Sequence, residues 1–162
     1  GTSMTVTKGI TLFSGSRALE LTYLIENLPP GESFHFAVEF NFAGMPGGAE
    51  DRFFYDAQGS SIGHLGSTLD LDASDYLGLI DQWLGVNVQW TSNRTAGVWC
   101  FPIETVSQSE GGFELVHQSV CVMPHWIVTG DRAGRWAVAM DLVITHEHAI
   151  RESNIERAVV RA

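Results

Sequence analysis

Apolar and polar residues alternate along much of this chain, as in strands that bury one face and expose the other. The clearest run covers residues 34–42, in which every second residue is large and apolar: Phe34, Phe36, Val38, Phe40 and Phe42. The residues between them, including Glu39 and Asn41, point to the opposite face. Five large apolar side chains on one face need a core opposite them, so the pattern predicts a second layer of structure.

Alternation of the same period predicts a chain built almost wholly of strands. Further strands are expected over residues 17–28, 52–55, 68–71, 76–80, 86–90, 97–103, 113–128 and 135–146. Glycine, proline and small polar residues separate them, as at Pro29-Pro30-Gly31 and through residues 43–51. Only residues 75–83 and 150–160 suit a turn or two of helix. The pattern therefore predicts an all-β fold, a two-layer antiparallel β-sandwich.

The composition fits one globular domain and argues against several partners. The chain has 162 residues, of which 44% are hydrophobic and 17% charged, and its formal net charge is -10. This acidic balance argues against nucleic acid, and no apolar run approaches the roughly 20 residues of a membrane span. We interpret residues 1–4, three small residues before a methionine, as an expression scar, and residues 5–162 as a single domain cut from a larger protein. Because no signal peptide is evident, we expect a cytoplasmic location.

Two cysteines, Cys100 and Cys121, each lie in an apolar run. A free cysteine behaves as a small hydrophobe, so we expect two buried thiols. A disulfide between facing strands is the alternative, and it stays open because the sequence does not fix the distance between the two residues.

The most unusual polar stretch is residues 102–114, a predicted loop between two apolar strands. It carries Glu104, Glu110 and Glu114 together with the run Ser107-Gln108-Ser109 and a glycine pair. Two of the carboxylates could serve as the acid and base of a glycosidase. The same groups could instead bind sugar hydroxyls or a neighbouring domain, or cap their own turn. The spacing favours binding or a structural turn over catalysis.

Aromatic and histidine side chains form a second set of candidates. An exposed indole suits the apolar face of a sugar ring, and the tryptophans are Trp83, Trp90, Trp99, Trp126 and Trp136. Trp136 is in phase with an apolar stripe and is expected in the core, whereas Trp90 precedes a polar turn and is the best exposed candidate. His146-Glu147-His148 could hold a metal, but a solvated strand end explains it better. The other histidines show no paired spacing, and we expect neither metal nor cofactor.

Residues 102–114 also carry a family resemblance. The run Pro-Ile-Glu-Thr-Val-Ser-Gln-Ser-Glu-Gly-Gly-Phe-Glu, with residues 21–27 and 36–42, resembles the C-terminal β-sandwich domain of glycoside hydrolase family 57 enzymes, the 4-α-glucanotransferases and α-amylases. The resemblance implies a mutarotase-like supersandwich that follows an N-terminal (β/α)7 barrel. It also implies that the nucleophile and acid of a retaining mechanism lie in that barrel, so no catalytic residue is expected here.

Three functional hypotheses follow. The first is a non-catalytic accessory domain that packs against the catalytic barrel of its parent chain and supports it. The second is a carbohydrate-binding module for α-glucan. The third is an independent mutarotase-like epimerase, but its local histidine–carboxylate pair, His117 and Glu114, would face opposite ways on one strand. The residues expected to bind or dock are Glu39, Asn41, Trp90, Glu104, Ser107, Gln108, Ser109, Glu110 and Glu114.

Overall fold

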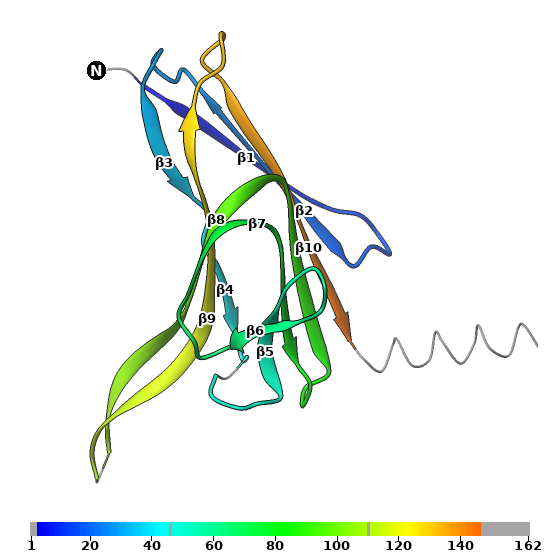
Figure 1. Cartoon of the computed structure of the whole chain (residues 1–162), viewed down its shortest axis with the longest axis vertical. Helices are drawn as coiled ribbons and strands as arrows, with labels where there is room; N and C mark the ends of the chain where they lie inside the picture. The colour runs from blue at the N-terminus through cyan, green and yellow to red at the C-terminus, as the bar shows by residue number, and fades with distance from the viewer. Residues whose placement is uncertain (1–2, 46, 110, 147–162) are drawn as a thin grey trace, which may run out of the picture.

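The computed structural model describes residues 3–45, 47–109 and 111–146, and over these ranges the chain forms strands and turns without a helix. Ten strands follow one another along the chain (Figure 1). They are β1 (Thr5–Leu12), β2 (Ala18–Glu26), β3 (Ser33–Ala37), β4 (Phe40–Ala43), β5 (Arg52–Tyr55), β6 (Ser61–His64), β7 (Leu69–Asp81), β8 (Val86–Ser109), β9 (Gly112–Thr129) and β10 (Trp136–His146). Within the described ranges there is accordingly no helix long and apolar enough to cross a membrane.

The strands belong to one antiparallel, hydrogen-bonded sheet that folds over on itself. Its main path runs β1-β2-β10-β8-β7-β5-β6, and β9 pairs with β8 and also with β3 and β4. The first part of β8 pairs with β10 and its later part with β9, so this long curved strand belongs to both layers (Figure 1). Register shifts in β7 between Leu71 and Tyr76 mark the bend, as bulges commonly do. The predicted all-β, two-layer antiparallel β-sandwich is confirmed.

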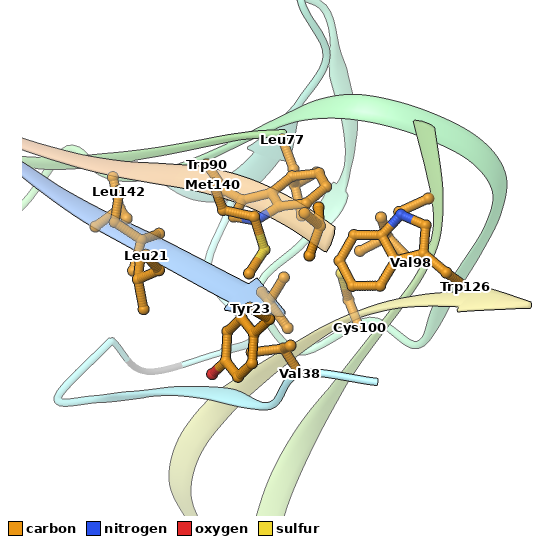
Figure 2. Close-up of a cluster of buried hydrophobic side chains, with 14 of the residues drawn as sticks. Leu21, Tyr23, Val38, Leu77, Trp90, Val98, Cys100, Trp126, Met140 and Leu142 are labelled. Atoms are coloured by element: carbon orange, nitrogen blue, oxygen red, sulfur yellow. The ribbon is translucent and has the colours of Figure 1, made fainter. Parts of the chain in front are cut away.

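The core lies between the two layers (Figure 2). One layer contributes Leu21, Tyr23, Leu77, Trp90, Met140 and Leu142, and the other contributes Val38, Val98, Cys100, Val122 and Trp126. The four phenylalanines of residues 34–42 pack against this core, as the alternation predicts. Trp136 is buried with them, which confirms its expected place.

The strand predicted over residues 34–42 is divided into β3 and β4 by a proline on its neighbour. The Val38 amide donates to the Pro124 carbonyl at 3.0 Å. Pro124 has no N–H to donate in return, so the ladder is interrupted at this point. The register nevertheless continues unchanged from Ala37 opposite His125 to Phe40 opposite Val122.

Several predicted segments are parts of longer strands. Residues 68–71 and 76–80 lie almost wholly within β7, so the helical turn expected over residues 75–83 is wrong. Residues 86–90 and 97–103 are likewise parts of β8. At the bends of both strands most side chains are exposed, so polar residues interrupt the alternation without ending the strand. The helical turn expected over residues 150–160 lies outside the described residues.

The alternation does not predict β1 or β6. β1 is an edge strand whose apolar residues Val6, Ile10 and Leu12 are mostly exposed, and Lys8 and Gly9 interrupt their pattern. β6 has only four residues and includes Gly63. Strands at the edge of a sheet bury few side chains, so hydrophobic periodicity is weakest there.

Both cysteines are buried and free, as expected. Cys100 pairs with Val122, whereas Cys121 pairs with Phe101 in the adjacent row. Adjacent rows of a sheet point to opposite faces, so the two thiols face apart and the disulfide alternative does not apply. Burial raises the pKa of Cys100 to about 12 and that of Cys121 to about 11, so both thiols stay protonated at neutral pH.

Candidate functional site

Within residues 102–114, the described residues 102–109 and 112–114 form the two strands of a β-hairpin and not the predicted loop. The end of β8 pairs with the start of β9 from Glu104 opposite His117 to Ser109 opposite Gly112. The hairpin extends away from the sandwich as a two-stranded arm (Figure 1). Gly112 has a φ of 123°, a backbone conformation that side-chain-bearing residues rarely adopt, and it helps to close the turn. Glu110 lies outside the described residues.

One face of this arm carries three exposed apolar side chains, in neighbouring rows to Glu104 and beside Gln108. Val106 pairs with Leu115, and Phe113 lies two residues before Leu115 on the same face. The three side chains, named here the hairpin stripe, are 66%, 68% and 78% exposed for Val106, Leu115 and Phe113. Gln108, a predicted binding residue, pairs with Phe113 and so flanks the stripe. The opposite face of the arm carries the predicted Ser107 beside Glu114.

The carboxylates of the arm do not form a catalytic pair. Glu104 and Glu114 lie in rows three apart, or about 10 Å along the ribbon, and face opposite sides. A retaining pair needs carboxyl groups roughly 5 Å apart on one site. His117 also faces away from Glu114, and its Nε2 donates to the Met45 carbonyl at 3.0 Å. The base of the arm is thus anchored, and the local histidine–carboxylate pair of the epimerase hypothesis does not converge.

Glu39 and Asn41 contact each other but lie apart from the hairpin stripe. Asn41 Nδ2 donates to Glu39 Oε1 at 2.6 Å, and both residues are exposed on the outer face of the second layer. Asn41 pairs with Cys121, which follows the arm residue His117 by four positions along β9. The predicted binding residues are therefore divided between the arm and this outer face, and they do not form one site.

The prediction that the Trp90 side chain is exposed is wrong, because it is 0% exposed. Residues 91–94, which read as a polar turn, instead continue β8, and Thr91 pairs with both Tyr76 and Asp141. The side chain of Trp90 consequently points into the core beside Leu77 and Leu142 (Figure 2). The exposed indole belongs to Trp83, which is 74% exposed in the turn between β7 and β8.

Buried charged side chains hold the turn that carries Trp83 in place. Asp81 is fully buried, and its Oδ1 accepts a hydrogen bond from the Leu84 amide at 2.9 Å. Its Oδ2 lies 3.1 Å from Arg52 Nε without an aligned hydrogen bond, so charge holds the two groups together. The Arg52 guanidinium lies 5.6 Å from the centre of the Trp83 ring, within the range of a cation–π contact. A buried ion pair therefore fixes the base of an exposed aromatic side chain.

Two histidines that showed no spacing in the sequence meet on the outer face of the second layer. His35 Nε2 and His125 Nδ1 share a hydrogen bond of 3.0 Å, and the Trp99 ring stacks on His125 at 3.9 Å. A side chain on Gly97 would overlap the His125 ring, so glycine is needed beneath it. Burial, and then the charge of His35, lower the pKa of His125. Only the strand register brings these residues together, which is why the sequence did not predict the cluster.

No group of three metal-ligating side chains is present among the residues that the structure describes. Of the suggested His146-Glu147-His148 motif, only His146 falls in the described ranges.

Comparisons with known proteins identify the family of this chain. No curated protein sequence matches it. Its fold is similar to that of a crystal structure of 4-α-glucanotransferase from Thermococcus litoralis, with a TM-score of 0.61 and 20% sequence identity over 86% of this chain. The match covers only 18% of that longer chain. The family model for the C-terminal domain of α-amylase/4-α-glucanotransferase matches residues 1–140. This chain therefore belongs to the family of α-amylase/4-α-glucanotransferase C-terminal domains.

Proposed function

We propose that this chain is a non-catalytic accessory domain that packs against the catalytic barrel of an α-glucan-acting hydrolase or glucanotransferase and supports it. The family model describes the C-terminal domain of α-amylase/4-α-glucanotransferase. The similar glucanotransferase chain is several times longer than the region that matches. A separate catalytic part accounts for the remaining length. We also propose that the parent enzyme is a member of glycoside hydrolase family 57 and that its barrel uses a retaining mechanism.

The observation that carries the proposal is the hairpin stripe. Val106, Phe113 and Leu115 are large, apolar and about two-thirds or more exposed on one face of the arm. An apolar patch that extends from a rigid scaffold is typical of a surface that another protein part covers. The anchoring of the arm through His117 limits the conformational entropy lost on docking.

The placement of the predicted carboxylates that the structure describes supports a non-catalytic role. Glu104 and Glu114 face opposite sides of the arm, and Glu39 is hydrogen-bonded to Asn41 on another surface. No described pair of these predicted residues has the geometry that glycoside cleavage requires. In the proposed assembly, the barrel supplies both carboxyl groups and this domain supports the fold around them.

The experiment places Val106→Ser and Leu115→Ser together in the complete parent enzyme. We expect a lower melting temperature and weaker glucan conversion, because the two substitutions remove the apolar contact between the domains. Ile127→Ser is the matched control, since Ile127 is 71% exposed on the outer face of the second layer, away from the arm. If the double variant equals the control in both measurements, the arm is not the docking surface and the proposal fails.

A further inference from the structure

We infer that the turn between β7 and β8 is a binding site for one glucose unit of an α-1,4-glucan, with the Trp83 ring as its platform. The identity of the sugar rests on the proposed function, which places this domain beside an enzyme that acts on α-glucans. The site itself rests on the geometry of Trp83, Arg52 and Asp51.

Trp83 differs from the other tryptophans in its exposure. Trp90, Trp126 and Trp136 are buried, and Trp99 is stacked against His125. Trp83 is 74% exposed, although an indole ring gains more than most side chains from burial. The Arg52 guanidinium lies over the ring at 5.6 Å from its centre, and most of the Trp83 side chain remains exposed to solvent. A flat, open aromatic face matches the apolar C–H face of a pyranose ring.

The platform is held in place before any ligand arrives. The Gln82 amide donates to the Asp51 carbonyl at 2.9 Å, which ties the turn to the start of β5. On the other side of Trp83, the buried Asp81 holds the Leu84 amide. Both neighbours of Trp83 are thus fixed through their backbone. Such preorganisation lowers the entropy cost of binding.

Polar groups suited to sugar hydroxyls lie beside the ring. The Asp51 carboxylate is 41% exposed and its Oδ1 lies 3.8 Å from Arg52 Nε, next to the guanidinium that contacts Trp83. Asp51 can accept hydrogen bonds from sugar hydroxyls, and the Arg52 guanidinium can donate them. The formal net charge of -10 favours a neutral ligand over an anionic one. An aromatic face with one acceptor and one donor beside it is a common arrangement in small-ligand sites.

The test is titration of this chain with maltoheptaose, followed by tryptophan fluorescence and by calorimetry. We expect saturable binding in the millimolar range and a change in fluorescence, because Trp83 is the most exposed indole. Trp83→Ala should lower the affinity roughly tenfold or more, and Trp83→Phe, which keeps a smaller ring, roughly threefold. Asp51→Asn should weaken binding by a smaller factor. Ile127→Ala is the matched control and should bind as the unaltered chain does.

Several outcomes would overturn the site. Absence of saturable binding by the unaltered chain would do so, as would equal affinity of Trp83→Ala and the control. Equal binding of cellohexaose would overturn the assignment to an α-linked glucan. Val106→Ser with Leu115→Ser should leave maltoheptaose binding unchanged, so this site and the docking arm can fail separately. If Trp83→Ala weakened only the association with the catalytic part, the turn would be a docking contact and the sugar site would be refuted.

Discussion

The two ends of β8 carry similar alternation but have different surroundings. In the sandwich, Val88, Trp90 and Val98 are at most 2% exposed, because the opposite layer covers them. In the arm, Val106 is 66% exposed and its partner Leu115 is 68% exposed. Alternation shows that one face of a strand is apolar, but it does not show what covers that face. The difference separates residues that stabilise this domain from residues that would bind another one.

The largest expected effect is at the covered end. Trp90→Ala should lower the free energy of unfolding by about 3–5 kcal/mol, because it removes a fully buried ring and leaves a cavity between the layers. Urea unfolding monitored by circular dichroism measures the change. Val106→Ala in the same strand is the control and should change stability little. Similar losses for the two variants would mean that the arm is part of the core.

The next effect concerns the turn of Trp83, which rests on the buried carboxylate of Asp81. Asp81→Ala should cost roughly 2–3 kcal/mol, since it leaves the Leu84 amide without its acceptor and Arg52 without its buried partner. Asp51→Ala, a more exposed neighbour 3.8 Å from Arg52, is the control and should cost less than about 1 kcal/mol. Urea unfolding compares the two variants. Equal losses would show that the buried carboxylate is not the brace.

Periodicity predicted the parts of the fold that pack against the core. The stripe from Phe34 to Phe42, the strand that ends at His146 and the burial of Trp136 all follow from positions that alternate in phase. The bends of β7 and β8 could not be predicted in this way, because exposed residues on both faces remove the alternation. The break at Val38 depends on Pro124, which is distant in sequence and known as a neighbour only from the register.

The candidate surfaces were harder to predict than the fold. The polar residues of 102–114 suggested a loop and concealed the alternate positions of Val106, Phe113 and Leu115. The polar stretch that follows Trp90 favours an exposed indole at that position, yet this stretch continues the strand. The pairing of His35 with His125 requires two strands to be aligned. The resemblance to a known family was more informative about function than any of these local patterns.

A smaller effect is expected from pH, in the His35–His125 cluster. Burial and the charge of His35 lower the pKa of His125 below its ordinary value of 6.5. Between that lowered pKa and 6.5 the unfolded chain binds more protons than the folded one, so stability is lost as the pH falls through this window. The nearby Asp70 acts in the opposite direction and limits the effect.

His125→Gln should reduce this dependence on pH. The measurement is the free energy of unfolding from urea titrations at several pH values between 7.5 and 5, roughly the range in which histidine titrates. The difference between the unaltered chain and the variant isolates the contribution of the cluster from that of other groups. His64→Gln, at an exposed histidine on β6, is the matched control. An unchanged slope in His125→Gln would contradict the assignment of the effect to this residue.

The smallest effect is expected at the uncovered end of β8. Leu115→Ser in the isolated chain should change the free energy of unfolding by no more than about 0.5 kcal/mol, because Leu115 is 68% exposed and loses little packing. The same substitution in the complete parent enzyme should cost clearly more, if the catalytic part covers the hairpin stripe. The informative quantity is therefore the difference between the two contexts, measured by the same unfolding experiment. An equally small loss in the isolated chain and in the parent enzyme would mean that the stripe is uncovered in the parent enzyme, and it would contradict the docking role. A large loss in the isolated chain would place Leu115 in the core of this domain.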